Sequence, residues 1–343
     1  MSELEIRKDY LGGESIATIY FGGGTPSLLQ SGEIRSQLEK IYSIFDVEPD
    51  PEITIEVNPD DIDDRKLNEW RDAGVNRLSI GIQSFFEEDL KWMNRAHNAE
   101  QAIESLRLAT QYFNNISMDL IYGTPSLTNE SWKRNVQTSI ALRIRHLSCY
   151  ALTVEPKTPL YKMIAEHRTP NVDPDKQSEQ FLLLMQWLEE AGYEHYEISN
   201  FAKAGYRSRH NSAYWTGKTY IGIGPSAHSY DGSSRQWNVS NNTTYIDSIQ
   251  KRTIPYEKEI LTPVQRLNEY IMTSLRTKEG LDLSRLETAV RHEVIAASEK
   301  YIERELMVKE GEHIRLTRAG KLLADGIASG LFLSEDSPAK IIS

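Results

Sequence analysis

The sequence predicts an α/β fold in which parallel strands curl toward a barrel, followed by a small C-terminal module with the element order of a winged helix. Short β-branched or aromatic runs alternate with longer amphipathic stretches through the first two-thirds of the chain, a pattern typical of βαβ units. A polar residue, a glycine or a proline follows nearly every run. Because right-handed βαβ connections curl a sheet and bring its strand ends together, we expect a small-molecule site at the carboxyl ends of the strands.

The strands and helices of the barrel are expected in alternation. Strands are predicted at residues 17–21, 53–57, 77–81, 117–121 and 146–152. Amphipathic helices are predicted at residues 101–113, 128–142 and 175–191. Residues 1–10 have the pattern of the end of a helix, and a helix in a βα series is preceded by a strand. We therefore expect the barrel to lack its first strand within these residues.

The second half of the chain predicts an extension of the barrel and then a separate module. Residues 194–201 have a strand-like pattern, and an irregular region follows to about residue 260. The C-terminal module begins at Thr262-Pro263, with helices predicted at 264–276, 283–290 and 296–305, strands at 307–309 and 314–316, and a final helix at 318–330. We expect three domains: the partial barrel at residues 1–165, its extension at 166–261, and the winged-helix-like module at 262–343.

Composition narrows the classes of function. The 39 basic and 50 acidic residues give a net charge of −11, which disfavours binding to nucleic acid and to anionic membranes. No apolar run approaches the roughly 20 residues of a membrane span, and the N-terminus has no secretory signal. Cys149 is the single cysteine, so there is neither a disulfide framework nor a zinc knuckle. We expect a cytoplasmic protein with no stable membrane insertion.

A triple-glycine loop and polar side chains at the strand ends predict a ligand site. Gly22–Gly24 follow the first strand, where their backbone N–H and C=O groups can be reached by a ligand. Four polar residues lie at or just after the next three strands: Glu56, Gln83, Arg95 and Asp119. Together they favour a zwitterionic or sugar-bearing ligand, because arginine pairs with a carboxylate and the acids accept from hydroxyls or an ammonium. The alternative is a tight turn with ordinary helix caps and salt bridges.

Two motifs in the irregular region also have simpler explanations. Gly222, Gly224 and Ala227 match the G-x-G-x-x-A dinucleotide pattern, but the residues that follow cannot open the helix that a phosphate site needs. His210 lies in a predicted loop, downstream of two arginines and ahead of Tyr214 and Trp215. Such a histidine can be the axial ligand of a flat, carboxylate-bearing macrocycle. The alternative is a satisfied structural histidine.

Six segments occur in the order and spacing of one known family. They are residues 18–27 (TIYFGGGTPS), 52–59 (EITIEVNP), 77–84 (RLSIGIQS), 94–97 (NRAH), 118–123 (MDLIYG) and 210–215 (HNSAYW). On these segments the chain resembles the HemW branch of the radical S-adenosylmethionine (SAM) proteins, which are related to the oxygen-independent coproporphyrinogen III oxidases. The resemblance runs from about Leu4 to the C-terminal module.

The resemblance implies a partial (β/α)6 TIM-like barrel with a [4Fe-4S] cluster that binds SAM. By matching position, the residues implied to contact SAM are Gly23, Gly24, Thr25, Glu56, Gln83, Arg95 and Asp119. The family holds its cluster on a Cys-x3-Cys-x2-Cys loop after the first strand, and the sequence contains neither that strand nor that loop. Met1 is therefore expected to be an internal start or a trimmed end within the first helix. With Cys149 alone, we expect no [4Fe-4S] ligation and no SAM cleavage by this chain.

The resemblance also implies a function. The His-Asn-x-x-Tyr-Trp segment is a feature of the haem-binding HemW branch, whose members are understood to be haem chaperones. We therefore expect haem binding through His210, with Tyr214 as the rival ligand, and propionate pairing by Arg207 and Arg209. The alternative function is oxidative decarboxylation of coproporphyrinogen III by a radical SAM enzyme, and a third is an inert remnant of either.

The expected partners are haem and haem-acceptor proteins, with a homodimer as a candidate assembly. The C-terminal module has the element order of a winged helix, which is typical of DNA-binding domains. Its charges, however, disfavour DNA binding. Residues 299–312 hold five glutamates against three basic residues, a poor match for phosphate contacts. We expect no nucleic acid partner.

Overall fold

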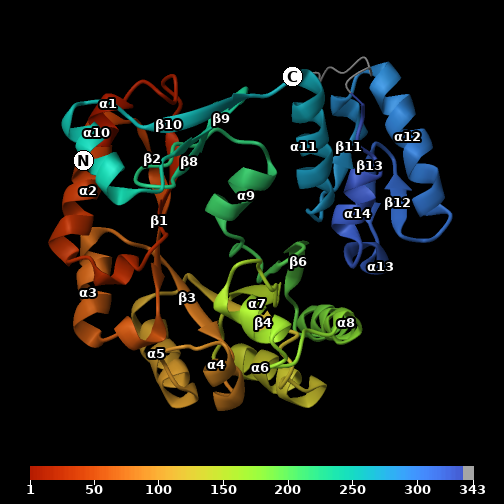
Figure 1. The fold of residues 1–343 in the computed structure, drawn as a ribbon, viewed down its shortest axis with the longest axis horizontal. Helices are drawn as coiled ribbons and strands as arrows, with labels where there is room; N and C mark the ends of the chain where they lie inside the picture. Colours follow the sequence, from red (N-terminus) through yellow and green to blue (C-terminus); the bar gives the residue numbers. More distant parts are fainter. Residues whose placement is uncertain (335–343) are drawn as a thin grey trace. The chain divides into compact units, whose positions relative to one another are not determined.

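The computed structural model describes residues 1–334, which fall into two compact units (Figure 1). The barrel unit consists of residues 19–34 and 52–208, and the appended unit consists of residues 1–18, 35–51 and 209 onward. None of the helices in residues 1–334 combines the length and the apolar character that a membrane crossing requires.

A curled sheet forms the centre of the barrel unit. Its strand order is β1-β2-β3-β4-β5-β7-β6. The strands are β1 (Ile16–Phe21), β2 (Val47–Val57), β3 (Arg77–Gln83), β4 (Ile116–Tyr122), β5 (His146–Ala151), β6 (Glu194–Glu197) and β7 (Asn200–Ala202). Strands β2 to β5 pair in parallel. The five predicted strands are confirmed, each within a few residues except β2, which begins earlier than expected.

The last two strands of the sheet differ from a purely parallel arrangement. The predicted strand at residues 194–201 is a hairpin, in which β6 pairs antiparallel with β7 and β7 pairs antiparallel with β5. Only Ile198 and Ser199 separate the two strands. A connection this short cannot cross over the sheet, so it can join only antiparallel neighbours.

Helices lie along one side of these strands (Figure 1). Those of the barrel unit are α3 (Asp64–Ala73), α4 (Glu87–Trp92), α5 (Ala99–Tyr112), α6 (Asn129–Ala141), α7 (Pro159–Ala165) and α8 (Pro174–Glu190), with the short helices η1 (Pro26–Leu28) and η2 (Pro59–Asp61). Helix α5 begins at a capping box in which Asn98 and Gln101 satisfy each other's backbone N–H groups. It buries Ala102, Leu106 and Ala109, the apolar side predicted from the sequence.

The two faces of the sheet have opposite chemistry. Along β3 and its neighbours, residues such as Leu78, Ile80 and Met118 are fully buried on the apolar face. Alternate residues form a polar face that is also buried, with Arg77 1% exposed and His146 0% exposed. This period-two alternation places the charged side chains and His146 of strands β2 to β5 on one surface, and the apolar core on the other.

The region expected to be irregular up to residue 260 is largely structured, which corrects that prediction. It contains β8 (His228–Tyr230), β9 (Ser234–Asn238) and β10 (Tyr256–Ile260) in a sheet of order β10-β9-β8, together with α9 (Arg209–Trp215) and α10 (Asn242–Gln250). The buried side of β9 consists of Ser234, Gln236 and Asn238. A strand whose buried side chains are polar shows no apolar alternation, so the sequence pattern does not reveal it.

Near the N-terminus, α1 (Ser2–Ile6) and α2 (Ser31–Ile44) complete the helices of the appended unit outside its C-terminal module. The predicted helix at residues 1–10 is shorter than expected. Glu3 is 1% exposed and accepts hydrogen bonds from the Gly224 backbone N–H at 2.8 Å and from Asn238 Nδ2 at 2.7 Å. Arg7 donates to the Gly222 carbonyl at 3.0 Å. The Gly222–Ala227 segment therefore binds α1 and leads into β8, and it opens no phosphate-binding helix.

The C-terminal module has the expected mixture of helices and a small sheet. Its elements are α11 (Pro263–Leu275), β11 (Leu281–Asp282), η3 (Leu283–Arg285), α12 (Thr288–Ile302), β12 (Met307–Glu310), β13 (His313–Leu316), α13 (Arg318–Lys321) and α14 (Ala324–Ser329). The sheet has the antiparallel order β11-β13-β12. The helix expected at 283–290 is instead a single turn, η3, and α12 begins at Thr288. The final helix is divided into α13 and α14.

Candidate functional site

A cavity of about 210 Å³ lies at the carboxyl ends of the strands of the barrel unit. Six of the seven residues expected to contact SAM line it: Gly24, Thr25, Glu56, Gln83, Arg95 and Asp119. The seventh, Gly23, adjoins the lining through its backbone N–H, which donates to Glu56 Oε2 at 3.2 Å. Glu56, Gln83 and Asp119 lie on β2, β3 and β4, whereas the glycine loop follows β1, so the sheet topology brings these residues together.

The glycine loop after β1 is packed against Glu56. Gly23 and Gly24 have φ angles of 74° and 73°, values that disfavour residues with a Cβ. At Gly22 a Cβ would lie 2.6 Å from the ring of Tyr20, so only glycine fits there. The Tyr20 hydroxyl donates to Glu56 Oε1 at 2.7 Å. Both oxygens of this carboxylate are therefore held in place on the wall of the cavity.

Arg95 lines the same cavity with part of its hydrogen-bonding capacity unused. Its Nη2 donates to Asn58 Oδ1 at 3.0 Å and to the Gly81 carbonyl at 3.2 Å. Its Nε is buried without a hydrogen-bond partner among the described residues. Gln83, another lining residue, has a left-handed φ of 68°, which turns the chain out of β3. A buried N–H group without a hydrogen-bond acceptor lowers the stability of the fold. A polar ligand in the cavity would supply the missing acceptor.

Asp119 on β4 has a carboxyl group whose protonation changes near neutral pH. Burial raises the pKa of its carboxyl to about 7, with the nearby Glu56 acting in the same direction, while a hydrogen bond from Ser148 and the charges of Arg77 and Arg95 act against the rise. The carboxyl therefore changes between a hydrogen-bond donor and an acceptor near neutral pH. Such a group suits the recognition of a polar ligand.

The His210 segment forms a short helix, α9, where a loop was expected. The sequence contains neither glycine nor proline between Arg209 and Thr216, and Gly217 follows with a left-handed φ of 67°. One turn of helix brings His210 and Tyr214 onto the same face, with ring centroids 5.2 Å apart in an edge-to-face arrangement. His210 Nδ1 lies 2.9 Å from Thr18 Oγ1. Tyr214 is 42% exposed.

Two aromatic groups beside His210 differ in their surroundings. Burial raises the pKa of the Tyr214 phenol above its ordinary value, with a smaller contribution from Tyr220, so this phenol stays protonated at neutral pH. The Trp215 indole lies under the guanidinium of Arg276 on α11, 4.9 Å from its centroid, and its Nε1 is buried without a hydrogen-bond partner in the part of the chain that is described. Trp215 thus packs α9 onto the first helix of the C-terminal module.

The two arginines before His210 have carboxylate partners within the protein. Arg207 Nε lies 2.7 Å from Glu194 Oε2, and Arg209 Nη2 lies 2.7 Å from Glu48 Oε2. Arg209 also donates to the carbonyl of Asp50 at 2.6 Å. These contacts engage part of each guanidinium group, and propionate pairing by Arg207 and Arg209 stays a prediction.

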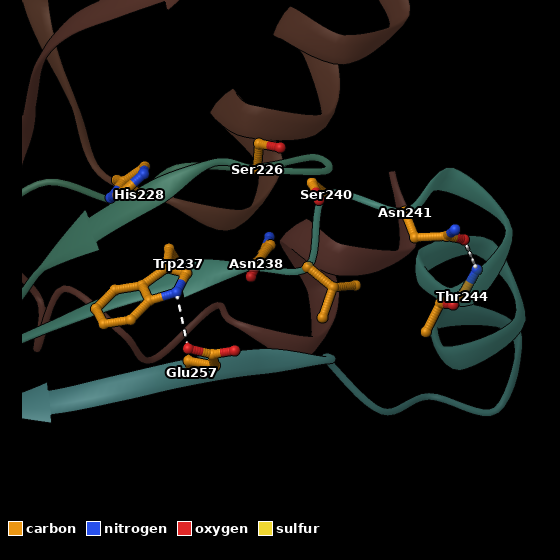
Figure 2. A pocket seen from close by; sticks show the side chains of 9 residues that line it. Ser226, His228, Trp237, Asn238, Ser240, Asn241, Thr244 and Glu257 are labelled. Carbon is orange, nitrogen blue, oxygen red and sulfur yellow. Dashed lines mark hydrogen bonds between the residues drawn. The ribbon is translucent and has the colours of Figure 1, made fainter. Parts of the chain in front are cut away.

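A larger cavity, of about 400 Å³, lies on the β8-β9-β10 sheet of the appended unit (Figure 2). It contains none of the predicted site residues. Its most prominent side chains are already engaged with each other: Trp237 Nε1 donates to Glu257 at 3.2 Å, and the ring of His228 stacks on Trp237 at 6.1 Å. Asn241 caps α10. Most residues that line this cavity are exposed. The strand-end cavity, with its partly buried polar and charged side chains, is therefore the better candidate for a ligand site.

Side chains that could bind a metal ion are not clustered among the described residues. Within residues 1–334, no group of three or more His, Cys, Asp or Glu side chains is placed to hold a metal ion. Cys149, the single cysteine of the sequence, is 1% exposed on the apolar face of β5. Burial raises the pKa of its thiol, which disfavours the thiolate that a metal needs.

Two family models match the chain, and curated relatives extend the match to nearly its whole length. Residues 3–138 match the Radical SAM superfamily and residues 261–323 match the HemN C-terminal domain. The haem chaperone HemW of Bacillus subtilis is 33% identical over 331 residues, covering 94% of this chain and 87% of that protein. HemW of Mycobacterium tuberculosis (strain H37Rv) is 32% identical over 332 residues, covering 96% of this chain and 84% of the relative. The chain belongs to the HemW haem chaperone family.

A solved structure agrees with this assignment at the level of the fold. The radical SAM enzyme coproporphyrinogen III oxidase (HemN) of Escherichia coli has a TM-score of 0.80 and 23% sequence identity, over 96% of this chain and 81% of that one. The predicted radical-SAM-type half-barrel with an added C-terminal domain is thereby confirmed.

Sequence reasoning missed several residues that support the sites of this HemW-family chain. Asn58 holds Arg95, and its position two residues after Glu56 at the same strand end was an available signal. Tyr20 orients Glu56, and Thr18 contacts His210. Neither of these strand residues carries a local signal, because their partners lie 36 and 192 positions away.

Proposed function

We propose that this chain binds haem and passes it to acceptor proteins. The observation that carries the proposal is the match to curated haem chaperones named HemW, at 31–33% identity over 94–96% of the chain. The placement of His210 and Tyr214 on one helix face supports it, because an imidazole and a phenol are both known ligands of haem iron. The similarity to the E. coli oxidase is one of fold, and it carries no argument for decarboxylation.

His210 is the proposed axial ligand. A neutral imidazole binds both ferric and ferrous iron, whereas a phenol must lose its proton to bind ferric iron well. His210 and Tyr214 belong to the same unit and the same helix, so their local geometry is set by α9 and its neighbours. Haem is the cargo in this proposal, and the side chains have to hold it and also release it.

The strand-end cavity is the proposed SAM site. The backbone of Gly23, Gly24 and Thr25 would border the ligand, and Glu56 and Asp119 would accept from its hydroxyl and ammonium groups. Arg95 would gain an acceptor for its buried Nε, and Gln83 would add an amide. In radical SAM proteins the cofactor supplies radical chemistry, and here these side chains bind and orient it.

We further propose that a chain of these 343 residues does not cleave SAM. A site-differentiated cluster needs three thiolates, and the sequence has one cysteine, whose side chain is buried. Anaerobic reconstitution with iron and sulphide should therefore give no stoichiometric [4Fe-4S] absorbance. An EPR signal from such a cluster at one per chain would overturn this part of the proposal.

Two parallel incubations separate the chaperone from the oxidase. The protein is mixed with haem in one, and with coproporphyrinogen III, SAM and a reductant in the other, together with an active oxidase as the positive control. The proposal expects a stoichiometric Soret band in the first and no protoporphyrinogen in the second. It also expects transfer of the haem to an apo-acceptor protein in the cytoplasm, the compartment we propose. Formation of protoporphyrinogen in the second incubation would contradict the chaperone assignment.

A further inference from the structure

The imidazole of His210 is held by a hydroxyl from a distant part of the chain. Thr18 on β1 places its Oγ1 2.9 Å from His210 Nδ1, although 192 positions separate the two residues. Both belong to the appended unit. The contact is partly buried, which limits competition from water.

The chemistry of imidazole assigns a role to this contact. When one ring nitrogen binds a metal, the other carries the proton, and metal-binding histidines almost always donate that N–H to a protein acceptor. A hydroxyl oxygen at Nδ1 can act as such an acceptor. With the proton on Nδ1, Nε2 is the nitrogen that coordinates iron. Threonine suits this task on a strand, since its β-branched side chain has few χ1 rotamers and holds the hydroxyl in place.

A second contact fixes the plane of the ring. The Tyr214 ring meets the imidazole edge to face, 5.2 Å between centroids, and Tyr220 meets Tyr214 in the same way at 4.7 Å. The hydrogen bond to Thr18 and the contact with Tyr214 come from different elements, β1 and α9. Together they restrict the rotation of the His210 side chain before any ligand binds.

We propose that Thr18 is a positioning residue for haem binding: its hydroxyl accepts the Nδ1 proton of His210 and directs Nε2 to the iron. This inference rests on the proposed function, because it assumes that His210 is the axial ligand. Loss of the acceptor should weaken haem binding by about tenfold, the lower end of what such outer partners contribute to metal sites.

The test compares Thr18→Val, which keeps the shape and removes the hydroxyl, with Thr18→Ser, which keeps the hydroxyl. Haem affinity is measured by Soret titration, and the iron–histidine stretching frequency is measured by resonance Raman spectroscopy of the ferrous complex. Thr18→Val should bind haem about tenfold more weakly, with a shifted stretching frequency. Thr18→Ser should restore both towards the wild-type values. Thr18→Ala replaces Thr18→Val if circular dichroism shows that the valine variant is unfolded.

His210→Ala, alone and combined with Thr18→Val, separates the possible failures. The positioning role predicts that Thr18→Val has no further effect once His210 is alanine. An equal loss of affinity in both backgrounds would show a merely structural role, and a wild-type stretching frequency in Thr18→Val would overturn the inference as well. If His210→Ala itself keeps the wild-type Soret spectrum, the proposed ligand is wrong, and the role of Thr18 fails with it.

Discussion

The strand-end cavity and the His210 helix are two candidate sites of different construction. At the cavity, Glu56 on β2 accepts from Tyr20 and Gly23, and Arg95, in the loop after α4, donates to Asn58 and Gly81. At α9, a hydrogen bond to Thr18 and an edge-to-face contact orient His210, and Tyr214 beside it is 42% exposed.

This difference fits the two tasks proposed for them. A site that must hold a cofactor in one orientation benefits from side chains whose hydrogen bonds are already made. A site that must release its cargo to another protein benefits from a ligand group with exposed neighbours such as Tyr214.

The buried polar face of the barrel unit should be sensitive to the loss of one charge. Arg77 and Glu52 are 2% and 4% exposed in their side chains and lie 3.8 Å apart. Arg77→Met leaves a buried carboxylate without this cation, so the free energy of unfolding in urea should fall by about 3–5 kcal/mol. The double variant with Glu52→Leu should recover much of this loss.

A matched control comes from an exposed ion pair. Arg65 is 70% exposed beside Glu69 on α3, so Arg65→Ala should cost no more than about 0.5 kcal/mol. Equal effects of Arg77→Met and Arg65→Ala would mean that the polar face is not buried as described, and the contrast between the two sites would fail.

Stability should depend on pH through Asp119. Its pKa is about 7 in the folded chain, above its ordinary value of 3.8. The folded carboxyl keeps its proton where the unfolded one has lost it, so the stabilising contribution is complete below about pH 3.8 and is lost as the pH rises through about 7. The slope contributed is at most about 1.4 kcal/mol per pH unit. In urea titrations at pH 5 to 8, Asp119→Asn should remove that slope.

The packing of α9 on the C-terminal module should tolerate a change at Trp215. Its indole N–H is buried without a partner among the described residues, and its ring meets Arg276 at 4.9 Å. Trp215→Phe keeps an aromatic ring and removes the unsatisfied donor, so the free energy of unfolding should change by less than about 1 kcal/mol. The Soret spectrum of the haem complex should be unchanged. A lost Soret band in a folded Trp215→Phe protein would instead show that the indole is needed for haem binding.

The smallest effect is expected when DNA is added to the protein, because we expect the C-terminal module not to bind it. Glu310 and Glu312 pair with Arg315 and Arg291 at 2.6 and 2.7 Å, so the acidic stretch also engages nearby cations. Random duplex DNA at physiological ionic strength should give no salt-dependent change in fluorescence anisotropy. Binding that weakens steeply with salt would contradict the expectation that this module has no nucleic acid partner.

The sequence predicted the strands of the barrel unit well because their apolar residues alternate with polar ones and their ends carry glycine or proline. The same reasoning brought Glu56, Gln83, Arg95 and Asp119 to one edge, since parallel strands place their carboxyl ends together. It failed where the buried residues are polar. The buried side chains of β9 are Ser, Gln and Asn, so this strand shows no apolar period.

Long-range partners were also beyond local patterns. Nothing near Thr18 in the sequence indicates His210, and nothing near Arg209 indicates Glu48, because each pair forms only once the appended unit has folded. The helical state of residues 209–215 was missed for a related reason. Seven residues are too few for a helical period to be read, and the conformation is decided by its packing.

The central claim is that His210 holds the haem, and a haem titration of His210→Ala beside the wild type and Tyr214→Phe tests it most directly. Circular dichroism first establishes that all three proteins are folded. We predict that His210→Ala shifts or abolishes the Soret band, and that Tyr214→Phe leaves it close to the wild-type position. A wild-type Soret spectrum in folded His210→Ala, with the band altered instead in Tyr214→Phe, would contradict the claim and assign the iron to the tyrosine.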